Sequence, residues 1–496
     1  MIRVTRDNKT DSIPDTNPDT NPDTNEDGER DGNRTALVTG ASGYVGGHLV
    51  PRLLDEGWSV RVLTRRAASL DDRPWRQWVD VVEGDVASES DMHTALRGIR
   101  TAWYLVHSMD DRPDFAERDR EAAAAFAGAA KRADVERIVY LGGLHPEGEE
   151  LSPHLASRVE VGDTFLSSGV PTAVLQAAVV LGDGSASFDM LRYLTTRLPA
   201  MIAPKWLENR IQPIAIDDVI TLLAGAGDLP PEVNRTFDVG GPEVMTYREM
   251  MQRFADVTGR RHRPIVTVPV LTPRLASHWV GLVTPISAGL AKPLVGSLVH
   301  EVVSKEDDIF DLVPIRGGLT DFDTAVAEAM ETAKPDTAPR NLAIAIGGVA
   351  ACAVIGGLAT KPDSAWDRSL DKPDWQPPAV AFPVVWSLLY TGIAASGATA
   401  LNALDKKGDA AGRSTYLTAF GTNLVLNAGW SWVFWGAKRP GLATIESAVL
   451  TASSVDLARR TASAQRTSGL ALIPYAAWCG FATVLTGAIA RRNRRR

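Results

Sequence analysis

Short apolar runs alternate with amphipathic stretches through the first half of the chain. Runs at 35–39, 58–63, 79–83, 101–106, 137–141 and 172–180 have the length and content of buried β-strands. Helix-length stretches separate them, the first from about residue 43 to 56. This alternation predicts an α/β Rossmann domain with a doubly wound parallel sheet.

The second half carries longer apolar segments, at 342–360, 379–400, 416–435, 442–457 and 469–490. Several of them approach the roughly 20 residues that span a bilayer. We therefore expect an all-α five-helix transmembrane bundle, and a buried soluble bundle is the alternative. The stretch 264–314 is apolar but broken by prolines and charges. For this stretch we expect helices that close a substrate pocket, and contact with a membrane surface stays open.

Composition divides the chain further. Residues 1–34 are polar and repeat Asp-Thr-Asn-Pro, which predicts a disordered acidic tail. We expect a nucleotide-binding domain with its substrate subdomain at 35–330, a linker at 331–340, a membrane domain at 341–490 and a basic tail at 491–496. The net charge of −8 argues against a nucleic-acid partner. The two cysteines, Cys352 and Cys479, lie far apart in apolar stretches, so we expect neither disulfides nor a metal site.

Three glycines follow the first strand in the pattern Gly40-x-x-Gly43-x-x-Gly46 and open a helix. In this context the glycines allow a tight turn and close approach of a dinucleotide pyrophosphate to the helix N-terminus. The second strand ends in Thr64-Arg65-Arg66 without an acidic residue, which favours NADP(H) over NAD(H). Alternatively, the two arginines begin a solvated helix. The residues that we assign to the cofactor are Gly40, Ser42, Gly43, Tyr44, Val45, Gly46, Arg65, Asp85, Val86 and His107.

Residues 35–314 resemble the atypical short-chain dehydrogenase/reductases of the NmrA-like group. The motifs are the glycine loop, Tyr104-Leu-Val-His-Ser-Met109, Tyr140-Leu-Gly-Gly-Leu144, Leu151-Ser-Pro-His-Leu155 and Phe237-Asp-Val-Gly-Gly-Pro242. The resemblance implies a Tyr-x-x-x-Lys pair that exchanges a proton during hydride transfer. Here His154 and Arg158 stand at those positions, and Gly142 and Gly143 stand where the family has a serine. His154 supplies the proton in one interpretation; in the other, the domain binds the cofactor without turnover.

Residues 341–490 resemble the TspO/MBR (tryptophan-rich sensory protein) family. The motifs are Trp366, Lys372-Pro-Asp-Trp375-Gln-Pro-Pro378, Trp386, Leu426-Asn427-Ala-Gly-Trp430-Ser431 and Pro474-Tyr475-Ala-Ala-Trp478. This chain departs from the family's pattern at Thr486, where the family usually has an asparagine. The resemblance implies an aromatic cavity for a tetrapyrrole or another flat apolar ligand. Its lining would be Trp366, Trp375, Trp386, Asn427, Trp430 and Trp478, although each can equally be a helix-packing anchor.

Together these features predict a multi-pass membrane protein with a cytoplasmic Rossmann domain. The first hypothesis is an NADP(H)-dependent oxidoreductase whose membrane domain binds an apolar substrate, and the second is a non-catalytic NADPH sensor coupled to a ligand receptor. Two independent functions in one chain form a third. A homodimer stays open. Five spans and a basic end at 491–496 conflict, since the spans place that end outside and the charges favour the inside.

Overall fold

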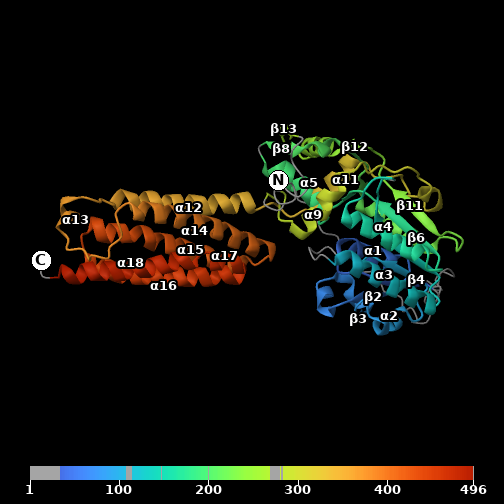
Figure 1. The fold of residues 1–496 in the computed structure, drawn as a ribbon, viewed down its shortest axis with the longest axis horizontal. Coiled ribbons are helices and arrows are strands. Elements are labelled where there is room, and N and C mark those ends of the chain that lie inside the picture. The colour runs from blue at the N-terminus through green and yellow to red at the C-terminus, as the bar shows by residue number, and fades with distance from the viewer. Residues whose placement is uncertain are drawn as a thin grey trace, which may run out of the picture. The chain divides into compact units, whose positions relative to one another are not determined.

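The computed structural model describes residues 34–107, 114–146, 148–198, 200–268, 280, 283–286 and 288–494. The described chain forms two compact units, Met1–Ala333 and Lys334–Arg496, and the division falls inside the predicted linker. Figure 1 shows a mixed α/β unit and a bundle of long helices. The tail predicted at 1–34 lies outside the described residues except for Arg34, and so does the end of the chain at 495–496.

The first unit is built on a seven-stranded sheet in the order β11-β6-β5-β4-β1-β2-β3. Every pair of neighbouring strands is parallel. This confirms the predicted doubly wound sheet, whose order reverses between β1 and β4. The strands are β1 (Thr35–Thr39), β2 (Ser59–Thr64), β3 (Asp80–Glu83), β4 (Thr101–Tyr104), β5 (Arg137–Gly143), β6 (Thr172–Ala177) and β11 (Arg235–Val239).

Helices cover both faces of this sheet because alternate strand residues point to opposite sides. On β1, Ala36 and Val38 belong to a core that includes Leu49 and Val219, whereas Leu37 belongs to a second core with Phe126. The helices of the first core are α1 (Tyr44–Asp55) and α6 (Ile216–Gly225). Those of the second are α2 (Glu89–Leu96), α3 (Phe115–Arg132) and α4 (Pro153–Leu166).

A smaller subdomain follows β6 and has its own core cluster. The strand predicted at 172–180 ends at Ala177, and β7 (Val180–Leu181) pairs instead with β10 (Ile214–Ala215). Two further pairs are β8 (Met201–Pro204) with β13 (Ile265–Val268) and β9 (Arg210–Ile211) with β12 (Met245–Thr246). The helices are α5 (Ala186–Arg197), α7 (Tyr247–Val257), α9 (Ala288–Ser297), α10 (Ile309–Leu312) and α11 (Phe322–Thr332). The all-helical expectation for 264–314 is therefore wrong at its start, because β13 pairs with a strand more than 60 positions earlier.

The second unit is a bundle of five long helices: α12 (Ala338–Ala359), α14 (Ala381–Lys406), α15 (Ala410–Ser431), α16 (Pro440–Ala464) and α18 (Ile473–Arg492). Two short helices, α13 (Ala365–Ser369) and α17 (Arg466–Leu470), and a π-helical turn at Trp432–Gly436 complete it. Three segments are long and apolar enough to cross a membrane, namely α12, α14 and 466–492. The prediction of five spans is thus supported for three helices and stays a prediction for α15 and α16.

Large apolar side chains point outward from all five long helices. Leu358 on α12 is 69% exposed, Leu388 on α14 is 70% and Val425 on α15 is 71%. Ile445 on α16 and Val484 on α18 are also exposed. A soluble bundle keeps its outer face polar. The exposed apolar surface therefore fits lipid better than water.

Candidate functional site

The glycine loop between β1 and α1 has the tight geometry that its spacing predicts. Gly40 has a φ of +72°, and a Cβ there would lie 2.6 Å from the carbonyl oxygen of Leu105. A Cβ on Gly46 would lie 2.5 Å from the carbonyl oxygen of Gly40. The Gly43 amide donates to that same oxygen at 2.9 Å. No other residue fits at positions 40 and 46 without moving backbone.

The N-terminus of α1 is available for an anion. Its N-cap, Gly43, has no side chain that could accept from the first turn, and that turn contains no acidic residue. The free amides and the helix dipole favour a pyrophosphate here. The Tyr44 ring packs beside Gly182 and Gly184 of the subdomain. Its buried hydroxyl has no partner among the described residues, and Val45 packs against the first core.

Two charged strand ends flank the loop. Arg65 and Arg66 follow β2 directly and are exposed, which leaves their guanidinium groups available to a phosphate. Asp85 follows β3 and is exposed as well. One of its carboxylate oxygens accepts from the Ala87 amide at 3.0 Å, so Asp85 also closes its own turn. Val86 is partly buried against the second core.

Arg73 is a residue near the loop that the sequence did not single out. It lies between two short 3-10 helices after β2, Ala67–Leu70 and Pro74–Trp78. Its guanidinium donates to the carbonyl oxygen of Ser42 at 2.7 Å. Only tertiary structure brings it there, and no local pattern marks an arginine in an exposed turn. Arg73 adds a third positive charge beside the glycine loop, after those of Arg65 and Arg66.

His107, His154 and Arg158 come together at the ends of β4 and β5. The His107 Nε2 is buried and has no partner among the described residues. Burial first, and then the positive charges of Arg158 and His154, lower the pKa of His107 to about 3. His107 is therefore neutral at physiological pH. Residues 108–113, which include the end of the predicted Tyr104–Met109 motif, lie outside the described residues.

Helix α4 presents His154 and Arg158 one turn apart, as predicted. Ser152 caps the helix by accepting from the Leu155 amide, and Pro153 occupies its first position. The His154 ring stacks on Phe115 with centroids 4.1 Å apart and planes at 16°. The Arg158 Nε is buried without a partner. An arginine held this way, with no carboxylate against it in the described part of the chain, is ready to donate to a ligand oxygen.

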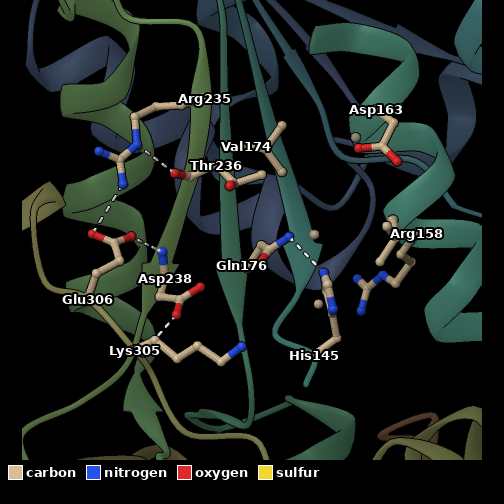
Figure 2. A pocket seen from close by; sticks show the side chains of 14 residues that line it. His145, Arg158, Asp163, Val174, Gln176, Arg235, Thr236, Asp238, Lys305 and Glu306 are labelled. Atoms are coloured by element: carbon tan, nitrogen blue, oxygen red, sulfur yellow. Dashed lines mark hydrogen bonds and ion pairs between the residues drawn. The ribbon is translucent and has the colours of Figure 1, made fainter. Parts of the chain in front are cut away.

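A cavity of about 320 Å³ opens between α4 and the strands β5, β6 and β11. Figure 2 shows the Arg158 side chain at one wall and Lys305 at another. Gly142 and Gly143, at the positions of the family's serine, also line it. A Cβ on Gly143 would lie 2.8 Å from Leu155 Cδ1, whereas a Cβ on Gly142 meets nothing closer than 3.5 Å.

His145 lines the same cavity and was not predicted. Its Nε2 lies 3.3 Å from the Gln176 amide nitrogen (Figure 2). Its Nδ1 lies 3.1 Å from the Pro146 carbonyl oxygen. An amide nitrogen only donates and a carbonyl only accepts. We therefore assign a proton to Nδ1, with Nε2 accepting from Gln176. A histidine between a strand and a loop carries no sequence signal for such a role.

In the second unit, the predicted tryptophans fall into small aromatic groups. Trp430 stacks on Phe434 at 5.0 Å, and Trp366 meets the same ring edge-on at 5.4 Å. Trp375 and Trp478 both contact Phe481, at 5.9 and 5.2 Å. Trp386 lies 6.3 Å from Tyr475. The structure thus brings Trp366 together with Trp430 and Trp375 together with Trp478, and places Trp386 on a separate ring pair.

Asn427 lies at the centre of a hydrogen-bond network inside the bundle. Its side-chain oxygen accepts from the Tyr390 hydroxyl at 2.9 Å and from the Cys352 thiol at 3.3 Å. Its amide nitrogen donates to the Tyr475 hydroxyl at 3.1 Å, and that hydroxyl donates to Asn423 at 2.8 Å. The polar groups of Asn427 are therefore used within the protein, as expected for a packing anchor.

Two buried polar side chains of the helical unit lack partners among the described residues. The Trp430 Nε1 and both carboxylate oxygens of Glu446 are buried without a hydrogen bond in the described part of the chain. The two side chains stand at one level, because α15 and α16 run antiparallel. Tyr416 forms a hydrogen bond with Thr461, and Asn423 forms one with Ser454. A move toward the C-terminus of α15 is therefore matched by an equal move toward the N-terminus of α16. Continued, this register brings Trp430 opposite positions 446 and 447.

The comparisons with known proteins assign each unit. Residues 40–163 match the family model described as NAD(P)H-binding. A phosphate reductase of Streptomyces griseus, (4-alkanoyl-5-oxo-2,5-dihydrofuran-3-yl)methyl phosphate reductase, is 30% identical over 232 residues, 45% of this chain and 74% of its own. The ceramide reductase of Caulobacter vibrioides is 26% identical over 295 residues, 57% of this chain and 90% of its own. The first unit is thus an NAD(P)-binding, reductase-like domain.

The second unit gives the chain its family. Residues 343–492 match the TspO/MBR family model. The tryptophan-rich protein TspO of Chlorobaculum tepidum is 31% identical over 153 residues, 31% of this chain and 95% of its own. This chain belongs to the TspO/MBR family and carries an NAD(P)H-binding domain ahead of the family's helical domain. Both predicted family resemblances are confirmed, as is a nicotinamide cofactor; the preference for NADP(H) and the individual site residues stay predictions.

Proposed function

We propose that this protein is a membrane-tethered, NADPH-dependent reductase whose TspO/MBR unit binds a tetrapyrrole or another flat apolar ligand. The glycine loop carries this proposal, since it combines a crowded Gly40, an uncapped α1 and a neighbouring strand end with two arginines and no acid. The relatives of the first unit are reductases, one of them named for ceramide. A substrate that partitions into membranes fits the helical domain in the same chain.

In the proposed nucleotide site, the loop amides and the α1 N-terminus hold the pyrophosphate, and Arg65 binds the ribose 2′-phosphate. The bound NADPH supplies a hydride when a substrate is present. Gly40 and Gly46 allow the tight turn that brings the loop amides to a pyrophosphate. A side chain at either position would clash with the carbonyl oxygen of Leu105 or of Gly40. Arg73 holds the loop in place through the Ser42 carbonyl.

The proposed reaction is the reduction of a carbonyl group. Arg158 donates to the substrate oxygen and stabilises the negative charge that develops on it. With NADPH and a carbonyl substrate bound, His154 would supply the proton that converts the reduced oxygen into a hydroxyl, and solvent would then return a proton to His154. His107 is neutral and buried, so it contributes shape and no proton.

In the membrane unit, the rings around Phe434 and Phe481 provide faces on which a conjugated macrocycle stacks. Among the described residues, the Trp430 N–H beside these rings is a free donor, and the Glu446 carboxylate on α16 is a free acceptor. A ligand with its own donor and acceptor would satisfy both groups. This supports a nitrogen-bearing flat ligand more than a plain hydrocarbon.

Cofactor binding is tested first, by isothermal calorimetry on the full chain in detergent with NADPH and NADH. We expect NADPH to bind more tightly and the Arg65→Ala variant to lose this preference by roughly tenfold or more, since a charge-assisted phosphate contact is removed. Arg97→Ala, which removes an exposed arginine elsewhere, is the matched control. Equal affinity of the wild type for the two nucleotides would contradict the assignment of NADP(H). If neither nucleotide binds, the proposal of a reductase is wrong.

Turnover is tested next, with carbonyl-bearing lipids as substrates and NADPH absorbance as the readout. His154→Gln should reduce kcat while NADPH affinity stays, because the proton donor is lost and the loop is intact. A second function rests on the glycines at the family's serine position: a domain that senses NADPH without turnover. Tight NADPH binding with no oxidation for any lipid carbonyl, in wild type and variant alike, would favour that sensor.

A further inference from the structure

The outer face of the β8–β13 pair is apolar. Ile202 on β8 and Val266 on β13 are direct cross-strand partners. Their side chains are 66% and 60% exposed. Met201 and Ala203, the neighbours of Ile202 on the opposite face, are buried in the subdomain core. A two-sided apolar strand pair is unusual at a water-facing surface, where alternation normally places polar residues outside.

Basic residues flank this apolar pair. Arg260 and Arg261 are exposed just before β13, and Lys205 is exposed just after β8. Neither Arg260 nor Arg261 has an ion-pair partner within the described ranges. The whole chain carries a net charge of −8, so this local positive charge departs from the average. An apolar centre with a basic rim is the chemistry that binds an anionic lipid surface.

The same subdomain is joined to the membrane unit by a short connection. Phe322, Val326 and Ala329 of α11 share the core cluster of Met201 and Ala203. Helix α11 ends at Thr332 and α12, an apolar helix long enough to cross a membrane, begins at Ala338. An extended connection of this length reaches about 20 Å at most. The subdomain that carries the apolar pair is therefore the part of the first unit whose chain enters the membrane unit.

We propose that Ile202 and Val266 form a membrane-docking surface of the NAD(P)-binding unit. The two side chains enter the headgroup and acyl boundary of the bilayer, and Arg260, Arg261 and Lys205 bind anionic lipid headgroups around them. The surface lies on the subdomain that follows the parallel sheet. The proposal rests on the membrane setting of the proposed function and does not depend on turnover or on cofactor choice.

The test uses the full chain in lipid nanodiscs, made with and without phosphatidylglycerol, and a nitroxide attached at one position. Cys352 and Cys479 are replaced by alanine, and a single cysteine is introduced by Ile202→Cys. The matched control is Leu312→Cys, on α10 in the other core region, where the native side chain is 45% exposed. Accessibility to oxygen, which dissolves in lipid, is compared with accessibility to a water-soluble nickel complex.

We expect the label at 202 to be severalfold more accessible to oxygen than to the nickel complex, and the label at 312 to show the reverse. Removing phosphatidylglycerol, or introducing Arg260→Glu with Arg261→Glu, should shift the label at 202 toward water. Equal accessibility at 202 and 312 would overturn the proposal. Spin–spin broadening at 202 would also overturn it, because it would show a second copy on this face. NADPH calorimetry on the same samples reports separately on the proposed function.

Discussion

Gly40 and Gly57 share a backbone conformation and differ in what surrounds them. Their φ values are +72° and +82°, but a Cβ on Gly40 meets the Leu105 carbonyl at 2.6 Å and a Cβ on Gly57 meets nothing within 4 Å. Gly57→Ala should cost only the left-handed strain, about 1–2 kcal/mol. Gly40→Ala adds a backbone clash and should also abolish NADPH binding. Heat unfolding and calorimetry on both variants give the comparison.

Tight NADPH binding by Gly40→Ala would contradict the loop assignment. Weak binding by Gly57→Ala would show that general destabilisation, and not the loop, lowers the affinity. The second glycine therefore separates local geometry from global stability.

The buried His107 makes folding sensitive to acid. Its folded pKa, about 3, lies below the ordinary value near 6.5, so protons bind the unfolded chain preferentially between these two pH values. The stability that depends on neutral His107 is present above pH 6.5 and declines as the pH falls toward 3. Between pH 6.5 and 5 the loss should be up to about 2 kcal/mol. His107→Gln should flatten this part of the profile in denaturant unfolding of the full chain in detergent.

Parallel pH profiles for the wild type and His107→Gln would contradict the assigned burial. All other titrating groups are common to the two proteins, so their contributions cancel in the difference.

At the residue scale, sequence reasoning located what local pattern marks. Gly40, Gly43 and Gly46 are recognisable because one turn imposes one spacing. Arg73 and His145 were not found, since each reaches its place only through a contact with Ser42 or Gln176 that lies 31 positions away. Spacing in sequence carries no information on such contacts.

Serine substitutions on β5 test how much space the packing of α4 leaves at the positions of the family's serine. A Cβ on Gly142 meets no atom closer than 3.5 Å, whereas one on Gly143 would lie 2.8 Å from Leu155 Cδ1. Gly142→Ser should therefore be accepted with a change in unfolding free energy of less than about 1 kcal/mol. Gly143→Ser should cost about 1–3 kcal/mol through overpacking. Equal costs in denaturant titrations of the two variants would show that α4 shifts to admit either side chain.

On α15, Asn427 and Trp430 lie one turn apart and should behave differently. Asn427→Ala removes hydrogen bonds to Tyr390 and Tyr475 and should lower the stability of the bundle by about 1–2 kcal/mol. Trp430→Phe keeps an aromatic ring but removes the unpartnered N–H. It should therefore lower the affinity for a flat ligand more than it lowers the stability of the bundle. Heat-induced loss of helical circular dichroism reports stability, and protoporphyrin IX fluorescence quenching reports binding.

Thr418→Ala is the control on the same helix, because its exposed hydroxyl bonds only the Ser414 carbonyl of its own helix. If Asn427→Ala weakens protoporphyrin IX binding while the bundle keeps its stability, Asn427 contacts the ligand, and its assignment as a packing anchor is wrong.

Element types were easier to predict than element ends. The β1 to β6 strands were located because each is a short apolar run between turn residues. The break at Ala177 was missed, since residues 178–180 are as apolar as the strand before them, and only pairing shows that β7 joins β10. The β13 strand was missed because prolines and charges nearby indicated interrupted helices, and only its pairing with β8 shows that it is a strand.

The two units of the chain are either coupled or independent, and linkage distinguishes these cases. If NADPH raises the affinity for protoporphyrin IX by some factor, protoporphyrin IX must raise the affinity for NADPH by the same factor. The reductase and sensor hypotheses both predict a factor different from one, whereas two independent functions predict a factor of one. Titrating each ligand with and without a saturating amount of the other, on the full chain in detergent, measures both factors.

At the scale of the whole molecule, composition predicted two units of different character because water and lipid select different side chains. The linker predicted at 331–340 spans the division between Ala333 and Lys334, and the other predicted domain bounds stay predictions. The number of spans was harder, since α15 and α16 mix apolar residues with serine, threonine and charges. Helix length predicts a bundle, but hydropathy alone identifies three spans.

The order of the strands also has a consequence for synthesis. Every residue of β6 is buried in the finished sheet, and one of its edges is covered only by β11. The ribosome makes the 57 residues between Ala177 and Arg235 first, which takes roughly 3–12 seconds at ordinary rates. During that interval an apolar strand has an open edge. The nascent chain therefore depends on its subdomain, or on a chaperone, to shield β6 until its last neighbour is translated.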